Sequence, residues 1–164
     1  MIIRTASMAD LDSICQVENT CFPPAEAADR ASFIERLRYY PNHFHLLFKD
    51  GILVSFTDGF ATDERDLRDE MYEHAYLHNE NGAWQMIFGV NTLPEYRNRG
   101  YAGMLIREMI AAAKKENRLG LVLTCKDALV PFYSKFGFVN EGPSASIHGN
   151  AAWNQMRLTI LKSL

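Results

Sequence analysis

The fold is decided by two neighbouring stretches, Trp84-Gln85-Met86-Ile87-Phe88-Gly89-Val90 and Arg97-Asn98-Arg99-Gly100-Tyr101-Ala102. The first is apolar and typical of a strand, and an apolar helix pattern begins near Gly100. A strand that leads into a helix N-terminus presents unpaired backbone N–H groups, and the helix dipole adds about half a positive charge there. Glycine lets a phosphate approach the backbone, while Arg97 and Arg99 add charged donors. The pattern fits a diphosphate-binding turn and, equally, a plain helix start beside solvated arginines.

A second informative segment follows that helix. It reads Thr124-Cys125-Lys126-Asp127-Ala128-Leu129-Val130-Pro131-Phe132-Tyr133-Ser134-Lys135-Phe136-Gly137-Phe138. Together with the R-x-x-G-x-A element, this segment resembles the GNAT acetyltransferases, which use acetyl-coenzyme A. Within that family it is most similar to the arylalkylamine (serotonin) N-acetyltransferases. The resemblance spans nearly the whole chain and is strongest over residues 90–138, and Gly142-Pro143 also fits the closing hairpin of that group.

The resemblance implies an α+β fold in which a central mixed β-sheet is flanked by helices on both faces. It also implies that two neighbouring strands separate at the middle of the sheet, with the pantetheine of acetyl-CoA between them. The backbone of Val90, Asn91 and Thr92 would pair with the pantetheine, and a free amide near Val90 would polarise the acetyl carbonyl. The other residues that match the cofactor loop are Arg97, Asn98, Arg99, Gly100, Tyr101, Ala102 and Gly103.

Tyr133 is the catalytic residue that the resemblance implies, because it lies in the Pro-Phe-Tyr element, and it also counts among the cofactor-binding residues. A phenol has an ordinary pKa of about 10, so it is protonated at neutral pH and can donate to a forming thiolate. The alternative is an aromatic ring that only packs in the core.

The general base is where this sequence departs from its relatives. The animal arylalkylamine enzymes carry two histidines on the strand before the cofactor loop, and the matching positions here are Met86 and Phe88. Neither side chain accepts a proton, so a water chain to another group is expected. The sequence offers these candidates for that group: Asp58, Asp63, Glu26, His43 and His45. The two histidines alternate on an expected strand edge, which more often means that they face solvent.

The amine pocket is expected to draw on Phe22, Phe88, Thr124 and Trp153, with His148 near the closing hairpin. Aromatic walls suit an apolar or aromatic amine. An acidic rim from Asp63, Glu64 or Glu26 would suit a polyamine instead. Phe22 and Trp153 could equally be core residues.

Periodicity and turn residues predict the order of the elements. A short strand over 2–4 precedes a helix that is capped by Ser7 or Asp10 and ends near Thr20, and a second helix covers 28–39. Asp50-Gly51 predicts a hairpin between strands over 44–49 and 52–60. The acidic stretch 62–82 is expected to be a helix that lies over the surface, with a solvated charge run rather than a metal site. The remaining expected elements are a central strand over 84–90, a helix over 100–117, a parallel strand over 119–124, a short helix over 127–136 and an antiparallel pair over 138–140 and 151–160.

Composition is that of a globular protein and favours one domain over residues 1–164. Hydrophobic residues make up 48% and charged residues 23%, and the net charge of −3 argues against a nucleic-acid partner. Three cysteines without C-x-x-C spacing argue against a disulfide framework or zinc site and favour a cytoplasmic location. No signal peptide or membrane-spanning run is expected.

The sequence therefore predicts an acetyl-CoA-dependent N-acetyltransferase that acts on a small primary amine. Acetylation of a protein or peptide amine, and a catalytically weak coenzyme-A-binding sensor, are the alternatives. A homodimer is left open.

Overall fold

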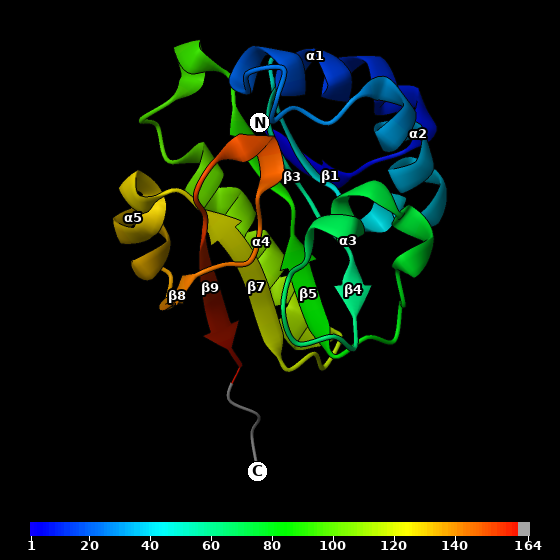
Figure 1. The fold of residues 1–164 in the computed structure, drawn as a ribbon. Coiled ribbons are helices and arrows are strands. Elements are labelled where there is room, and N and C mark those ends of the chain that lie inside the picture. Colours follow the sequence, from blue (N-terminus) through cyan, green and yellow to red (C-terminus); the bar gives the residue numbers. More distant parts are fainter. Residues whose placement is uncertain (161–164) are drawn as a thin grey trace.

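In the computed structural model, which describes residues 1–160, two β-sheets are covered by helices on both sides (Figure 1). Residues 161–164 of the expected unit lie outside the described residues. One sheet has the strand order β1-β2-β3-β6 and the other has the order β4-β5-β7-β9-β8. The expected α+β fold with mixed pairing and flanking helices is confirmed. The elements are β1 (Ile2–Thr5), α1 (Leu11–Cys21), α2 (Arg30–Tyr39), β2 (His45–Lys49), β3 (Ile52–Asp58), β4 (Ala61–Thr62), α3 (Asp69–Glu73), β5 (Trp84–Ile87), β6 (Gly89–Thr92), α4 (Tyr101–Lys115), β7 (Gly120–Cys125), α5 (Val130–Ser134), β8 (Val139–Pro143) and β9 (Asn154–Thr159).

The first sheet is built around the predicted hairpin. Strands β2 and β3 pair antiparallel, and Asp50 and Gly51 connect them with φ angles of 51° and 78°. Two successive positive φ angles match the twist of the flanking strands, which is why an Asp-Gly pair is favoured there. The hairpin prediction is confirmed.

The expected single strand over 84–90 is wrong in one important respect. It breaks at Phe88, so that β5 joins the second sheet and β6 joins the first. Gly59 permits the crossing, because a Cβ there would lie 1.8 Å from the carbonyl oxygen of Met86. The Phe88 N–H donates to the carbonyl of Asp58 at 2.8 Å and keeps the two strands together through the break. As a result the two sheets diverge beyond Phe88.

The second sheet contains the predicted parallel crossover. Strands β5 and β7 pair in parallel, and α4 connects them. Strand β9 lies between β7 and the outer strand β8, so the predicted closing antiparallel pair is also confirmed. The carboxyl end of β7 therefore faces β6 across the gap between the sheets.

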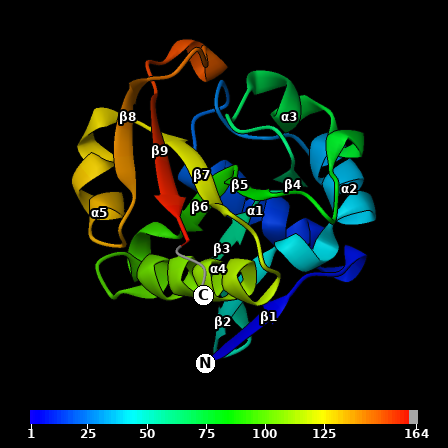
Figure 2. The same cartoon turned by 90° about the horizontal axis from the view of Figure 1, so that it is seen from below.

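The helices divide between the two faces of the first sheet. Helices α1 and α2 contact each other, and α1 contacts β3 and β6, whereas α4 contacts β2, β3 and β7 (Figure 2). Helix α1 buries Leu11, Ile14 and Val17, as its apolar spacing predicts. It also buries Glu18, which the sequence analysis did not single out.

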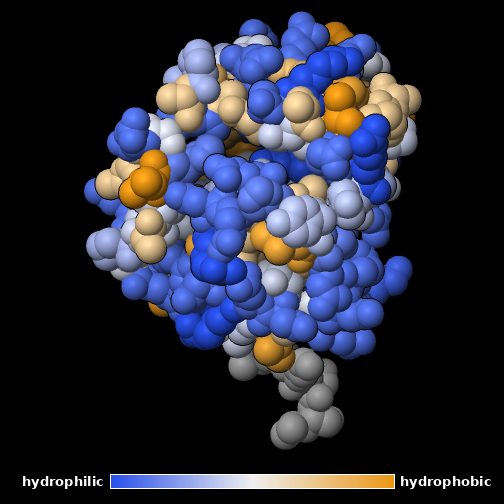
Figure 3. Space-filling view, turned by 45° about the vertical axis from the view of Figure 1, so that its right-hand side comes forward, coloured by the Kyte–Doolittle hydropathy of each residue, from blue (hydrophilic) through white to orange (hydrophobic). Residues whose placement is uncertain are grey.

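The acidic stretch 62–82 does not form one surface helix. It contains only the short helix α3 and a turn of 3₁₀ helix at Ala75–Leu77, joined by irregular segments. On the face shown in Figure 3, hydrophilic residues predominate and hydrophobic residues form small separate patches. Within residues 1–160, none of the helices combines the length and the apolar character that a bilayer crossing requires.

Candidate functional site

Three cavities adjoin the gap between the sheets. A large cleft of about 480 Å³ lies beside β6, the start of α4 and α5. An inner cavity of about 90 Å³ lies deeper, and an outer cavity of about 290 Å³ opens near α1, α2 and α3. The inner cavity shares Phe22, Val90 and Tyr133 with the large cleft, and it shares Glu18 and Phe88 with the outer cavity. The inner cavity thus connects the two larger spaces.

The large cleft contains the predicted anion cradle. The first bond within α4 runs from the Met104 N–H to the Gly100 carbonyl at 3.1 Å, so the N–H groups of residues 101–103 have no partner within the helix. Gly100 has a φ of 83°, and a Cβ placed there would meet nothing within 4 Å. The space beside the backbone is open, as a diphosphate requires.

The edge of β6 offers further backbone groups to the cleft. Strand β6 is the last strand of its sheet, and Leu93 N–H donates to the carbonyl of Val54 at 2.9 Å. Because bonded and non-bonded pairs alternate in an antiparallel ladder, the N–H and C=O groups of Val90 and Thr92 point away from β3. The Thr92 carbonyl accepts from Arg97 Nε–H at 3.0 Å on that side. This fits an extended pantetheine chain that lies along β6.

Two of the residues expected to bind the cofactor lie elsewhere. The backbone of Asn91 pairs with Phe56 of β3, and its side chain points to α1 rather than into the large cleft. Arg99 does not line the cleft, since its guanidinium lies over the ring of Tyr96, 5.4 Å from the ring centre. The others do line it: Val90, Thr92, Arg97, Asn98, Gly100, Tyr101, Ala102, Gly103 and Tyr133.

Gly100 provides a test of the cradle. We expect Gly100→Val to weaken coenzyme A binding at least tenfold, because the side chain would occupy the open space and strain a backbone with positive φ. Calorimetric titration with coenzyme A measures the effect. Gly51→Val is the matched control, since Gly51 also has positive φ and open space but lies in the β2–β3 hairpin. Equal affinity of the two variants for coenzyme A would contradict the assignment of the anion-binding cradle to the backbone at Gly100.

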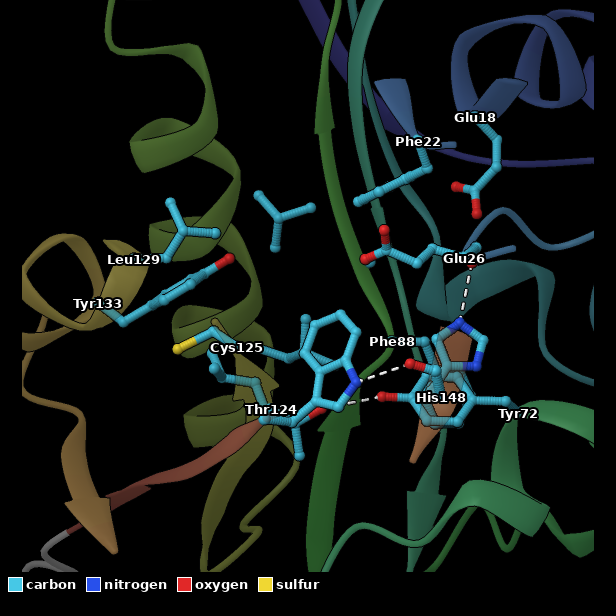
Figure 4. A pocket seen from close by; sticks show the side chains of 15 residues that line it. Glu18, Phe22, Glu26, Tyr72, Phe88, Thr124, Cys125, Leu129, Tyr133 and His148 are labelled. Carbon is cyan, nitrogen blue, oxygen red and sulfur yellow. Dashed lines mark hydrogen bonds between the residues drawn. The ribbon is translucent and has the colours of Figure 1, made fainter. Parts of the chain in front are cut away.

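Tyr133 lies where the large cleft meets the inner cavity. It is 6% exposed, and its ring packs against Phe132 of α5 and against Phe138, which precedes β8. Its hydroxyl points toward the interior of the inner cavity (Figure 4). Burial raises the pKa of Tyr133 well above its ordinary value, so the phenol keeps its proton at neutral pH. This state suits a proton donor.

The predicted amine-pocket residues converge on the inner cavity. Phe22, Phe88, Thr124 and Trp153 all line it, although they come from four distant parts of the chain. The sequence analysis mentioned His148 but missed Tyr72. These two rings stack with centres 4.9 Å apart. Tyr72 Oη lies 3.1 Å from Thr124 Oγ1, and the Trp153 indole donates to the His148 carbonyl at 2.8 Å, so the walls of the cavity are held together by hydrogen bonds.

Cys125 also lines the inner cavity but is not suited to be a nucleophile. Burial raises the pKa of its thiol to about 11, with a further contribution from Asp127. The thiol therefore stays protonated at neutral pH, and the thiolate is the reactive form. Its nearest sulfur neighbour is Met156 at 3.5 Å.

Glu18 is the functional candidate that the sequence analysis missed. Its carboxyl group lines the inner and outer cavities and points into the space from the side opposite Tyr133 (Figure 4). Oε1 accepts from Asn91 Nδ2 at 3.0 Å, and Oε2 accepts from the Ala28 N–H at 2.9 Å. Burial, with Asp58 nearby, raises the pKa of Glu18 to about 7. A carboxyl group with that pKa can accept a proton at neutral pH.

The signal for Glu18 is present in the sequence. It lies four residues after Ile14 and seven after Leu11, which places it on the buried face of the helix. A carboxylate is almost never buried unless it is paired or belongs to a functional site, so this spacing could have identified Glu18.

The other candidates for the general base are less suitable. Asp58 lines the outer cavity, but its Oδ2 accepts from Arg36 Nη1 at 2.8 Å in a buried ion pair. Glu26 lines both the inner and outer cavities and pairs with Lys126 at 2.8 Å. Asp63, His43 and His45 line none of the three cavities.

His43 also corrects the expectation that it faces solvent. It is buried, and its Nε2 lies 2.8 Å from Glu80, which also contacts His78. These three residues lie close enough to hold a metal ion. However, His78 Nδ1 accepts from the Ala61 N–H at 3.1 Å, so a neutral His78 ring carries its proton on Nε2. This ring therefore turns an N–H group, and not a lone pair, toward Glu80. The cluster is therefore better described as a hydrogen-bonded one.

Comparisons with known proteins agree with the geometry. Residues 11–138 match the model of the Acetyltransferase (GNAT) family. The chain is 30% identical to serotonin N-acetyltransferase of Mesocricetus auratus over 114 residues, which cover 69% of this chain and 54% of that protein. It is 26% identical to serotonin N-acetyltransferase of Macaca mulatta over 175 residues, which cover 90% of this chain and 84% of that protein. The chain thus spans about half the length of the first relative and most of the second.

A solved structure shares the fold. It is the GphF GNAT-like decarboxylase in complex with isobutyryl-CoA, with a TM-score of 0.84 and 22% sequence identity. The match covers 97% of this chain and 99% of that chain.

Proposed function

The chain belongs to the GNAT acetyltransferase family, and we propose from this premise that it transfers the acetyl group of acetyl-CoA to a small primary amine of the arylalkylamine type. Enzymes of this family are acyl-CoA-dependent transferases, and acetyl-CoA is the cosubstrate. One observation carries the proposal. The inner cavity joins the large cleft, where Tyr133 lies, to a buried carboxyl group with a pKa of about 7, that of Glu18.

Acetyl-CoA supplies a thioester, so a C–N bond forms, a C–S bond breaks, and an ammonium acceptor releases two protons. One proton must leave before the nitrogen can attack, and the other ends on the departing sulfur. The chain needs a base on the amine side, an acid on the sulfur side and a donor for the carbonyl oxygen.

The residues at the inner cavity provide these three functions. Glu18 takes the first proton from the amine side, where the inner and outer cavities meet. The Val90 N–H on the free edge of β6 donates to the developing oxyanion. The Tyr133 hydroxyl, at the junction with the large cleft, gives its proton to the sulfur and recovers one from the amine nitrogen.

The arylalkylamine type is supported by the walls of the cavity. Phe22, Tyr72 and Phe88 are aromatic, and the Tyr72 and Phe88 rings lie 4.9 Å apart. Flat aromatic surfaces favour an aromatic ring near the amine. The two mammalian relatives are named as serotonin N-acetyltransferases, which points in the same direction.

Acetyl-CoA turnover over a panel of acceptors tests this function. The panel contains tryptamine, phenethylamine, aliphatic diamines and short peptides with free N-termini. We expect the highest kcat/KM for the arylalkylamines. Preference for peptides would favour the protein or peptide acetyltransferase alternative. Tight binding of acetyl-CoA without turnover of any acceptor would favour the sensor alternative and refute the proposal.

A further inference from the structure

Asn91 presents a buried oxygen that no group in the described chain satisfies. The side chain is 1% exposed, and its Nδ2 donates to Glu18 Oε1 at 3.0 Å. Its Oδ1 has no hydrogen-bond partner within residues 1–160. Reversing the amide would only exchange the atom that lacks a partner. A buried acceptor without a donor costs about 1–3 kcal/mol, so such an atom needs an explanation.

The unpartnered oxygen lies next to Gly89, a residue of the cavities where the acceptor amine would bind. Asn91 and Gly89 are two residues apart on β6 and share one face of the strand. Gly89 lines the inner and outer cavities. A Cβ placed on Gly89 would lie 3.1 Å from Asp58 Oδ1, 3.7 Å from Asn91 Nδ2 and 3.9 Å from Asn91 Oδ1. Asn91 itself lines none of the three cavities, so its amide reaches them only through the space beside Gly89. Both oxygens therefore border the space that the missing side chain of Gly89 leaves open.

Three acceptor groups surround this space. Glu18 lines the same two cavities as Gly89, and Asp58 uses its other oxygen, Oδ2, to accept from Arg36. Asp58 Oδ1 and Asn91 Oδ1 offer lone pairs to the space, Glu18 does so when it is ionised, and the nearby Asn91 Nδ2 already donates to Glu18. A primary ammonium group offers three N–H donors and no acceptor, as a lysine side chain does. The chemistry of the two sides is complementary.

We propose that Glu18, Asn91 and Asp58 form a receptor for a primary ammonium group, with Asn91 as the residue that selects primary over N-methylated amines. This inference rests on the proposed function and specifies how the same site recognises its acceptor. The amine binds as its ammonium form and gives one proton to Glu18, while the N–H groups that remain are held by Asn91 and Asp58. An N-methyl group removes one donor and leaves Asn91 Oδ1 without a partner.

Asn91→Leu tests the proposal with phenethylamine and N-methylphenethylamine as acceptors. We expect the KM for phenethylamine to rise about tenfold or more, in line with one lost hydrogen bond to a charged group, with coenzyme A affinity unchanged. The kcat/KM ratio of the primary to the N-methylated amine should fall at least fivefold. An unchanged ratio, or an equal loss for both amines, would refute the selective role of Asn91.

Two further variants keep the test decisive. Thr57→Val is the matched control, because Thr57 Oγ1 is also buried and without a partner within the described residues, but no atom of Thr57 is among the three nearest to a Cβ placed on Gly89. It should leave both KM values unchanged. If Asn91→Leu does not fold, Gly89→Ala tests the receptor instead, because its methyl group would fill the space beside Gly89. An unchanged KM for phenethylamine in Gly89→Ala would refute the receptor.

Calorimetry separates this inference from the proposed function. Phenethylamine and N-methylphenethylamine are titrated into the wild-type protein saturated with coenzyme A, which does not require turnover. Tighter binding of the primary amine supports the receptor even if no acetyl transfer occurs. Equal binding of the two amines, together with acetyl transfer to both, would refute the receptor and leave the proposed function intact.

Discussion

Replacing Tyr133 by Phe should lower kcat about 100-fold or more while leaving the affinity for coenzyme A within a factor of two. A general acid contributes about 100- to 10,000-fold to a rate, and only the hydroxyl group is removed. The ring keeps its packing against Phe132 and Phe138, so the fold should be retained. Single-turnover kinetics with acetyl-CoA and phenethylamine measure the chemical step, and calorimetry measures the affinity.

The control for this variant is Tyr76→Phe. Tyr76 is 62% exposed and lines none of the three cavities. Its variant should behave as the wild type in both measurements. If Tyr133→Phe kept the wild-type rate, the sulfur would receive its proton from water or another group, and the acid role of Tyr133 would be wrong.

The parts of the fold that depend on local chemistry could be predicted from the sequence. The Asp50-Gly51 turn needs two positive φ angles, and the start of α4 needs the positive φ of Gly100, and both are present. The break of the strand at Phe88 could not be predicted. It depends on Gly59 coming within reach of the Met86 carbonyl, which is a contact between residues far apart in the sequence.

The same limit applies to the candidate site. The resemblance named residues that follow one another in a motif, and most of those in the expected cofactor loop, together with Tyr133, line the large cleft. It placed the backbone of Asn91 against the pantetheine, whereas that backbone pairs with Phe56, because the face of β6 that meets α1 depends on the pairing of β6 with β3. It also indicated that the strand of Met86 and Phe88 offers no base, but the candidates named in its place did not include Glu18. Met86 is fully buried in the core, and the base candidate comes from helix α1 on the other side of the cavity.

Phe88 shows why a base on α1 is reasonable in this chain. Its ring lines the inner and outer cavities, packs against Tyr72 and lies 5.2 Å from the Arg36 guanidinium. A large apolar ring excludes water from this part of the cavity, so a carboxyl group nearby loses hydration and its pKa rises. Phe88, which stands where the animal enzymes have a histidine, lines the same two cavities as Glu18, and burial is the main cause of the raised pKa of Glu18.

Replacing Glu18 by Gln should lower kcat/KM for phenethylamine about 100-fold or more and remove the acid limb of the pH–rate profile. In the wild type, activity should rise through about pH 7, because Glu18 with a pKa of about 7 accepts protons only when it is ionised. Gln has nearly the same shape, and reversal of the Asn91 amide would let its Oδ1 accept from the new side chain. The fold should therefore be kept. The profile is measured with saturating acetyl-CoA from pH 5.5 to 9.

The free energy of unfolding provides a second measurement, in which Glu18→Gln should be at least as good as the wild type although its activity is lower. The pKa of Glu18 rises from 4.5 in the unfolded chain to about 7 in the folded one, so the folded state binds more protons between these values. The free energy of unfolding then falls as pH rises through this window, and at pH 8 the buried charge costs on the order of 3 kcal/mol. Glu18→Gln should therefore melt at the same or a higher temperature than the wild type at pH 8, even though it is less active.

Glu26→Gln is the comparison variant, since Glu26 lines the same cavity but pairs with Lys126. If Glu26→Gln removed the acid limb and Glu18→Gln did not, Glu26 would be the base, and the high pKa of Glu18 would be a consequence of burial alone.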